Sequence, residues 1–128
     1  MIYYQEPYAE ISWDEVSKTV ILVWKKFAPL ATIKLVLNKV LELLEQKEGY
    51  KFLADSSNMM AFNKEAEEWM LHDWVPRSKA ANLKITAYIV PKSAMTRTSL
   101  SSMRGRTGLE TVAYFDSLEK AKAWLASQ

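Results

Sequence analysis

Residues 51–74 constrain the fold more than any other part of the sequence. Together with Tyr50 they predict a short apolar strand over residues 50–54, then a polar loop, then an amphipathic helix. This succession is typical of a sheet whose strands are connected through helices. The loop starts at Asp55, and open α/β sheets usually present functional groups at the carboxyl ends of their strands. The stretch therefore predicts an α/β fold with a candidate site directly after this strand.

The preceding part of the chain predicts an antiparallel hairpin and a long helix. Residues 8–13 alternate in polarity, and residues 19–24 form a β-branched run that we expect to be buried on both faces. Pro29 opens the helix and Gly49 ends it. Its apolar residues recur at helical spacing: Ile33, Val36, Leu37, Val40, Leu41 and Leu44. This face makes the helix a core element.

The helix that follows the polar loop has signals at both ends. Asn63 can cap it, acidic residues fill its first turns, and Pro76 is expected to stop it. We expect its inner face to consist of Ala66, Trp69, Met70 and Trp74.

The remaining chain predicts two strands and two helices. The strands cover residues 83–90 and 110–115, with a Ser- and Thr-rich helix over residues 93–103 between them. Asp116 and Glu119 form a capping box for a final helix. The expected inner face of that helix is Leu118, Ala121, Trp124 and Leu125. The resulting order, ββαβαβαβα, predicts a mostly parallel five-stranded sheet with one antiparallel edge strand and helices on its faces.

Length and composition indicate one domain over residues 1–128. The absence of cysteine excludes a disulfide framework and any thiolate nucleophile or thiolate metal site. The N-terminus does not resemble a secretion signal, and no apolar run approaches the ~20 residues that a membrane span needs. We therefore expect a cytoplasmic protein without a transmembrane segment.

Positive charge is concentrated in one part of the chain, although the net charge is only +2. Residues 74–109 contain no acidic residue. Their bases are Arg77, Lys79, Lys84, Lys92, Arg97, Arg104 and Arg106. Such a segment is either a solvated face, one that meets an acidic partner, or an anion site. The low total charge, and a basic segment that is not interleaved with exposed aromatic residues, argue against nucleic-acid binding.

The element order and three phrases of sequence resemble the SpoIIAA-like branch of the STAS superfamily. The phrases are FLADSS at the end of a strand, EEWMLHDWVP at the end of a helix and YFDSLEKAKAWL at the end of the chain. The resemblance covers nearly the whole chain. It implies a non-enzymatic module that binds protein partners, nucleotides or, in related folds, lipids.

The resemblance also implies a regulatory serine. In anti-sigma-factor antagonists a serine within Asp-Ser-Ser-Gly at a helix start is phosphorylated to switch partner binding. This chain has Asp55, Ser56 and Ser57, but Asn58 replaces the glycine, and the motif follows the strand directly. The alternative role of these residues is a simple loop stabilised by an Asx turn.

Catalytic chemistry finds little support. His72 is the only histidine, so a metal site would need Asp55, Asp73 or glutamates from separate segments to converge on it. Ser56 or Ser57 could form a triad with His72 and Asp73, but the chain has no G-x-S-x-G elbow. Walker and G-x-G-x-x-G motifs are also absent from a chain with three glycines. We expect no enzymatic activity and no cofactor.

An anion site without such a motif is predicted after the strand that Pro91 closes. Lys92 and Ser93 lie where this strand passes into a helix, and Arg97 follows one turn later. Arg104 and Arg106 can join from the next loop. These groups could hold a phosphate or a carboxylate.

Two functional hypotheses remain open. In the first, a protein partner binds the loop from Asp55 to Phe62 and the helix after Pro91. In the second, the protein carries an anionic amphiphile such as a lipid, whose head the anion site holds. The apolar tail would contact Met59, Met60, Phe62, Trp69 and Met95.

A homodimer is a further expectation. Tyr8, Ile11 and Trp13 are apolar residues of a strand that we expect at the edge of the sheet.

Overall fold

A mixed six-stranded sheet forms the centre of the protein in a computed structural model that describes residues 2–26, 28–57, 64–89 and 111–128. The strands lie side by side in chain order: β1 (Ile2–Glu6), β2 (Ala9–Asp14), β3 (Thr19–Trp24), β4 (Lys51–Asp55), β5 (Ile85–Ile89) and β6 (Thr111–Phe115). Neighbouring strands from β1 to β3 are antiparallel, and those from β3 to β6 are parallel. The α/β class is confirmed.

The expected strand count and element order are wrong. The chain begins with three strands instead of two, because β1 adds a sixth strand outside the hairpin. The antiparallel strand β2 consequently lies second from the edge and is not an edge strand. The helix expected over residues 93–103 lies outside the described residues.

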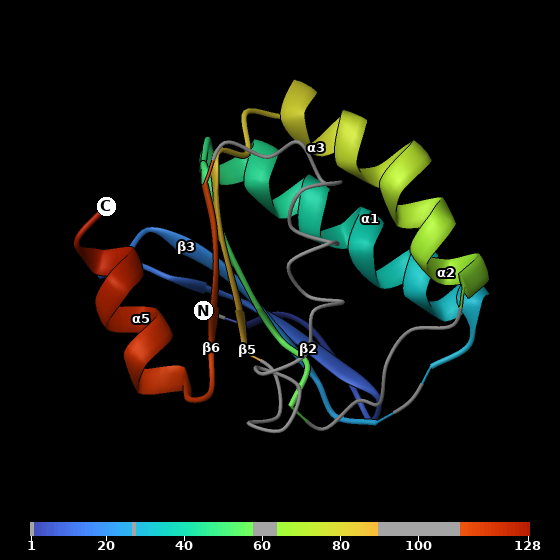
Figure 1. Cartoon of the computed structure of the whole chain (residues 1–128), viewed down its shortest axis with the longest axis horizontal. Coiled ribbons are helices and arrows are strands. Elements are labelled where there is room, and N and C mark those ends of the chain that lie inside the picture. Colours follow the sequence, from blue (N-terminus) through green and yellow to red (C-terminus); the bar gives the residue numbers. More distant parts are fainter. Residues whose placement is uncertain (1, 27, 58–63, 90–110) are drawn as a thin grey trace.

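Helices cover both faces of the sheet (Figure 1). One face carries α1 (Leu30–Lys47), α2 (Lys64–Trp69), the π-helical segment η1 (Met70–Trp74) and α3 (Val75–Ala80), and the other carries α5 (Leu118–Ala126). Connections between parallel strands are almost always right-handed. Because β3, β4 and β5 follow one another in a single direction across the sheet, both of their connections place helices on the same face.

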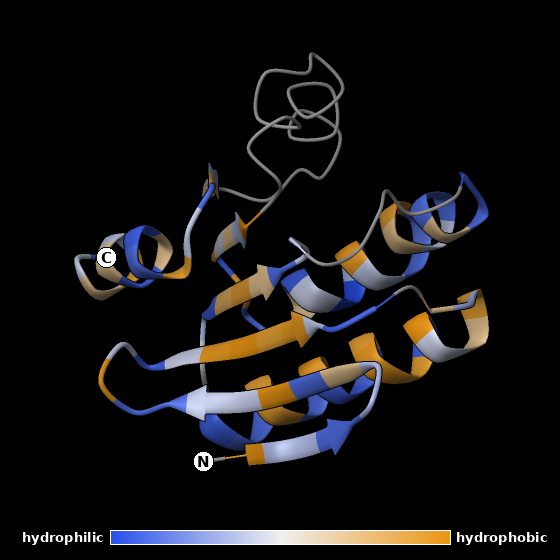
Figure 2. Ribbon diagram, turned by 90° about the horizontal axis from the view of Figure 1, so that it is seen from below, coloured by the Kyte–Doolittle hydropathy of each residue, from blue (hydrophilic) through white to orange (hydrophobic). Residues whose placement is uncertain are grey.

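The burial of each strand follows from this arrangement. Figure 2 shows β3 hydrophobic along most of its length, whereas β2 alternates between hydrophobic and hydrophilic residues. In β2 the side chains of Ala9, Ile11 and Trp13 are buried, and the residues between them are partly exposed. The expectation that β3 is buried on both faces is confirmed, since its residues divide between the cores on the two sides of the sheet.

Strand β1 pairs with β2 and contains two consecutive tyrosines, Tyr3 and Tyr4. The pairing register shifts between Ile2 and Tyr4, and such a bulge can turn neighbouring side chains to one face. Tyr3 and Tyr4 both pack against the core on the α1 side. The expected dimer edge is therefore wrong, because β1 pairs with β2 and leaves Ile11 and Trp13 in the core. Tyr8 is half-buried before β2.

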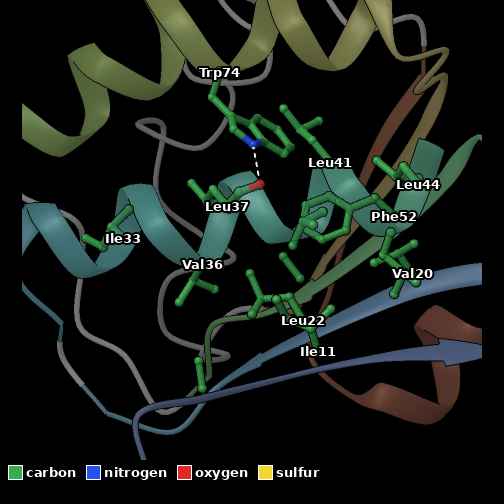
Figure 3. Packing of buried hydrophobic residues seen from close by; sticks show 14 of the residues in the cluster. Ile11, Val20, Leu22, Ile33, Val36, Leu37, Leu41, Leu44, Phe52 and Trp74 are labelled. Carbon is green, nitrogen blue, oxygen red and sulfur yellow. Dashed lines mark hydrogen bonds between the residues drawn. The ribbon is translucent and has the colours of Figure 1, made fainter. Parts of the chain in front are cut away.

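The larger core lies between the sheet and α1 (Figure 3). The six apolar residues predicted for α1 are all buried, as is Leu43. The helix ends where Glu48, the residue before Gly49, adopts the left-handed conformation. Gly49 serves a different purpose, because a Cβ atom there would lie 3.2 Å from the Trp13 ring.

The helical run after the polar loop continues past Pro76, so the predicted stop there is wrong. Proline removes a backbone donor and clashes with the carbonyl four residues earlier in a regular α-helix. Here the Val75 amide bonds to the Met70 carbonyl, one residue farther back than in an α-helix. This wider turn precedes Pro76 and allows the run to reach Ala80.

The smaller core lies beneath α5. Ala121 and Leu125 are buried against β4 and β5, as predicted, whereas Trp124 is half-buried and packs against Phe115. The predicted burial of Leu118 is wrong, since its side chain is exposed. The predicted cap is also displaced by one residue. Ser117, not Asp116, accepts the capping hydrogen bond, which the Lys120 amide donates.

Lys51 connects three parts of the chain at the amino end of β4. Its side chain is only 4% exposed. The Nζ atom donates to the Leu125 carbonyl at 2.7 Å and to the Ser17 carbonyl at 3.3 Å. The ammonium also lies 5.5 Å from the centre of the Tyr50 ring. A cation at the C-terminus of a helix is favourable, so Lys51 stabilises the docked position of α5.

We expect Trp74→Ala to lower the free energy of unfolding by about 3–5 kcal/mol, because it removes the largest side chain between α1 and the helical run. Urea denaturation followed by circular dichroism measures the change. Trp69→Ala is the control, since Trp69 is only half-buried and its loss should be clearly smaller. Equal losses in the two variants would contradict this account of the core.

Lys51→Met should destabilise the protein by about 1–3 kcal/mol, because two buried carbonyl groups lose a charged donor. Hydrogen exchange should accelerate in α5 more than in α1. Lys84→Met is the matched control, since Lys84 is exposed. If α5 keeps its protection in Lys51→Met, then Lys51 does not hold that helix.

Candidate functional site

An Asx turn follows β4 at the carboxyl edge of the parallel strands. One Asp55 carboxylate oxygen accepts hydrogen bonds from the Ser57 amide at 3.0 Å and from the Ser57 hydroxyl at 2.6 Å. The Ser56 amide donates to the Ile89 carbonyl at 2.9 Å and so extends the pairing of β4 with β5. Asp, Asn and Ser side chains form such turns because they hydrogen-bond their own backbone two residues on. The three predicted residues therefore form one local unit.

Asp55 lies on the face of the sheet that carries α5. Its register partners are Val23 on β3 and Ile89 on β5, and Ile89 in turn pairs with Phe115 on β6. The carboxylate thus stands in an otherwise apolar row across the edge of the parallel strands. Its hydrogen bonds to Ser57 satisfy this polar group locally.

The order of the described parallel strands creates no switch-point crevice at this edge. In open α/β sheets a crevice forms where the strand order reverses and neighbouring connections pass to opposite faces. Here β3, β4, β5 and β6 follow one another without a reversal. The position of the polar loop is as predicted, but the described parallel strands supply no switch point beside it.

The hypothetical triad is not assembled. Ser57 bonds to Asp55, His72 Nε2 lies 2.9 Å from a Glu68 carboxylate oxygen, and Asp73 accepts from Arg77 at 2.6 Å. His72 is also 76% exposed on the surface of the helical run. It lies inside the helical run, which continues to Ala80. Within the described ranges, no cluster of three His, Cys, Asp or Glu residues could hold a metal ion.

Most other candidate residues lie outside the part of the chain that the structure describes. They are Asn58, Met59, Met60, Phe62, Asn63, Lys92, Ser93, Met95, Arg97, Arg104 and Arg106. The anion site and most of the proposed apolar tail contacts therefore stay predictions.

Trp69 does have a described environment, and its partly buried ring packs against the larger core as expected. Its half-buried ring lies 5.7 Å from Lys34 Nζ on α1 and 6.0 Å from the Arg77 guanidinium on α3. Arg77 also donates to Asn38 at 2.8 Å. Arg77 also pairs with Asp73, and the sequence contained a signal for this ion pair, because the two residues are four positions apart. It was missed because Pro76 was expected to end the helix between them.

Comparison with known proteins does not assign the chain to a family. No protein-family model matches it, and no curated protein matches it either. In the described ranges, no helix has both the length and the apolar character needed to cross a membrane.

Asp55→Ala should accelerate hydrogen exchange at the Ser57 amide and lower stability by about 1 kcal/mol, because both bonds of the Asx turn lose their acceptor. Asp55→Asn retains an acceptor oxygen at the same place and should have the smaller effect. Exchange measured by NMR, together with urea denaturation, distinguishes the variants. Unchanged exchange at Ser57 in Asp55→Ala would show that the turn does not depend on this carboxylate.

Proposed function

We propose that this protein is a non-enzymatic, STAS-like interaction and signalling module of the cytoplasm that binds a protein partner at the carboxyl edge of its parallel strands. The mixed sheet with helices on both faces agrees with the α/β class that the resemblance implies, but its strand count and order differ from those expected. The proposal requires no cofactor.

The observation that carries the proposal is the placement of Ser57. Its side chain is exposed, and its hydroxyl donates to the Asp55 carboxylate in the Asx turn. A phosphoryl group at Ser57 would remove this donor and place a charge of about −1.5 to −2 beside an existing carboxylate. Repulsion between the two groups would open the turn. The local chemistry thus supports a switch that changes the shape and the charge of the edge together.

Ser57 suits this role better than Ser56. Ser56 is half-buried, and its amide continues the pairing between β4 and β5 through Ile89. A modifying enzyme must reach the hydroxyl group, and an exposed turn residue is more accessible than one tied to the sheet. We therefore assign the regulatory position to Ser57.

The carrier hypothesis gains no specific support from the described residues. Trp69, one of its tail contacts, lies beside the charged groups of Lys34 and Arg77. In the described part of the space between the sheet and the helices, Trp74 and Phe52 pack against each other with ring centres 5.8 Å apart. The interaction module is accordingly the better-supported function.

Affinity capture from extract of the source cells tests the proposal. We expect Ser57→Asp to change the recovery of a partner several-fold, because the new carboxylate faces Asp55, whereas Ser57→Ala adds no charge. Asn82→Asp is the charge-matched control, since exposed Asn82 precedes β5 at the opposite edge of the sheet. A partner recovered equally by wild type and Ser57→Asp, or affected equally by Asn82→Asp, would contradict a switch at Ser57.

Native mass spectrometry of the purified protein distinguishes the two hypotheses. If the protein is an interaction module, its mass should be that of the protein alone. An adduct of lipid mass that disappears on denaturation would instead favour the carrier.

A further inference from the structure

A second surface lies on the helical layer, at the end of the molecule opposite the Asx turn. The C-terminal half of α1 and the end of α3 border an open groove of about 390 Å³. Both helices lead into strands here, so the groove lies near the amino ends of β4 and β5. Its apolar part consists of Leu41 on α1 together with Ala80 and Ala81. Its acidic side consists of Glu42 and Glu45.

The two glutamates form an exposed acidic pair. They are three residues apart on α1, so their side chains lie on the same side of the helix. Glu42 is also held in place, because its carboxylate accepts a hydrogen bond from the Tyr3 hydroxyl at 3.0 Å. Gln46 donates to the same hydroxyl at 3.1 Å. Burial, and then the nearby Glu42, raise the pKa of Tyr3, so this phenol stays a donor at neutral pH.

Three described basic residues of α1 and α3 have other contacts. Arg77 borders the groove, but its guanidinium donates to Asp73 and to Asn38. On α1, Lys39 Nζ lies 5.3 Å from the centre of the Tyr4 ring, and Lys47 Nζ lies 5.9 Å from the centre of the Trp13 ring. Neither lysine lines the groove. Among the described lining residues, a small apolar floor therefore lies beside two carboxylates and one guanidinium, which gives a net negative charge.

We infer that this groove binds a lysine or arginine side chain of a partner polypeptide. The aliphatic stem would cover Leu41 and the two alanines, and the cationic head would lie between Glu42 and Glu45. Lysine and arginine side chains commonly bury their stems along apolar surfaces while the charged head stays near water. The negative wall repels phosphates, so nucleic acid is not the occupant.

This inference is independent of the switch at Ser57. It concerns the opposite end of the molecule and different residues, so either proposal can fail alone.

The test uses NMR titration of the 15N-labelled protein with a capped decapeptide of arginines spaced by two alanines. A matched peptide with citrulline in place of arginine is the neutral control. We expect saturable shifts at residues 38–45 and 77–81 for the arginine peptide only. The absence of shifts at millimolar peptide, or shifts spread over the whole surface, would overturn the inference.

Two variants locate the binding. Glu42→Gln with Glu45→Gln should weaken binding about fivefold or more, because two exposed ionic contacts are lost. Ala80→Met should weaken it without any change in charge, because the longer side chain fills the groove floor. The control is Glu65→Gln with Glu119→Gln, which removes two exposed carboxylates elsewhere and should bind like wild type. Equal weakening in this control pair would show non-specific attraction and overturn the inference.

A titration with spermine distinguishes two possible occupants with cationic groups, a side chain of a polypeptide and a free polyamine. A polypeptide occupant predicts that spermine binds more weakly than the arginine peptide at these residues. Equal or tighter spermine binding would overturn the assignment to a polypeptide.

Discussion

The contact between Trp74 and α1 holds the helical layer together. The indole N–H donates to the Leu37 carbonyl at 2.8 Å in the middle of α1, and the ring packs on Phe52 of β4 (Figure 3). The side chain is 1% exposed, so a single residue joins the helical run, α1 and the sheet. Aromatic residues of this kind combine a large buried area with one polar group that needs a partner. Because the partner carbonyl is fixed within a helix, the bond also defines where the run lies along α1.

Burial was predicted correctly in elements whose apolar spacing fits only one type of secondary structure. The face of α1 and the burial of β3 on both sides follow directly from residue spacing. Errors arose where tertiary structure overrode a local signal. A proline ends most helices, but the wide turn before Pro76 allowed this run to continue. β1 was missed because its short sequence has no strict alternation. The bulge allows the consecutive Tyr3 and Tyr4 to face the same core.

The candidate site could be located from the sequence because the carboxyl ends of parallel strands lie at one edge of a sheet. Asp55 and Ser57 were found in this way, and their mutual hydrogen bonds agree with the Asx turn that the residue types indicate. The groove was not predictable by the same reasoning. It depends on how two helices approach each other, and Glu42 looks in the sequence like any residue on a solvated helix face. Its hydrogen bond to Tyr3 depends on a strand that the sequence did not reveal.

The wide turn at η1 affects both the core and the groove. Met70 and Trp74 are four residues apart and face inward, while Asp73 and Arg77 are also four apart and pair on the surface. The Val75 amide reaches back to Met70, so the turn fixes the rotation of α3 relative to the residues before it. Consequently, the packing that buries Trp74 also positions Arg77 at the groove. A substitution that converted this turn to a regular α-helical turn would change the rotation of every later residue in the run, including Ala80. Core packing and groove shape therefore depend on the same local backbone geometry.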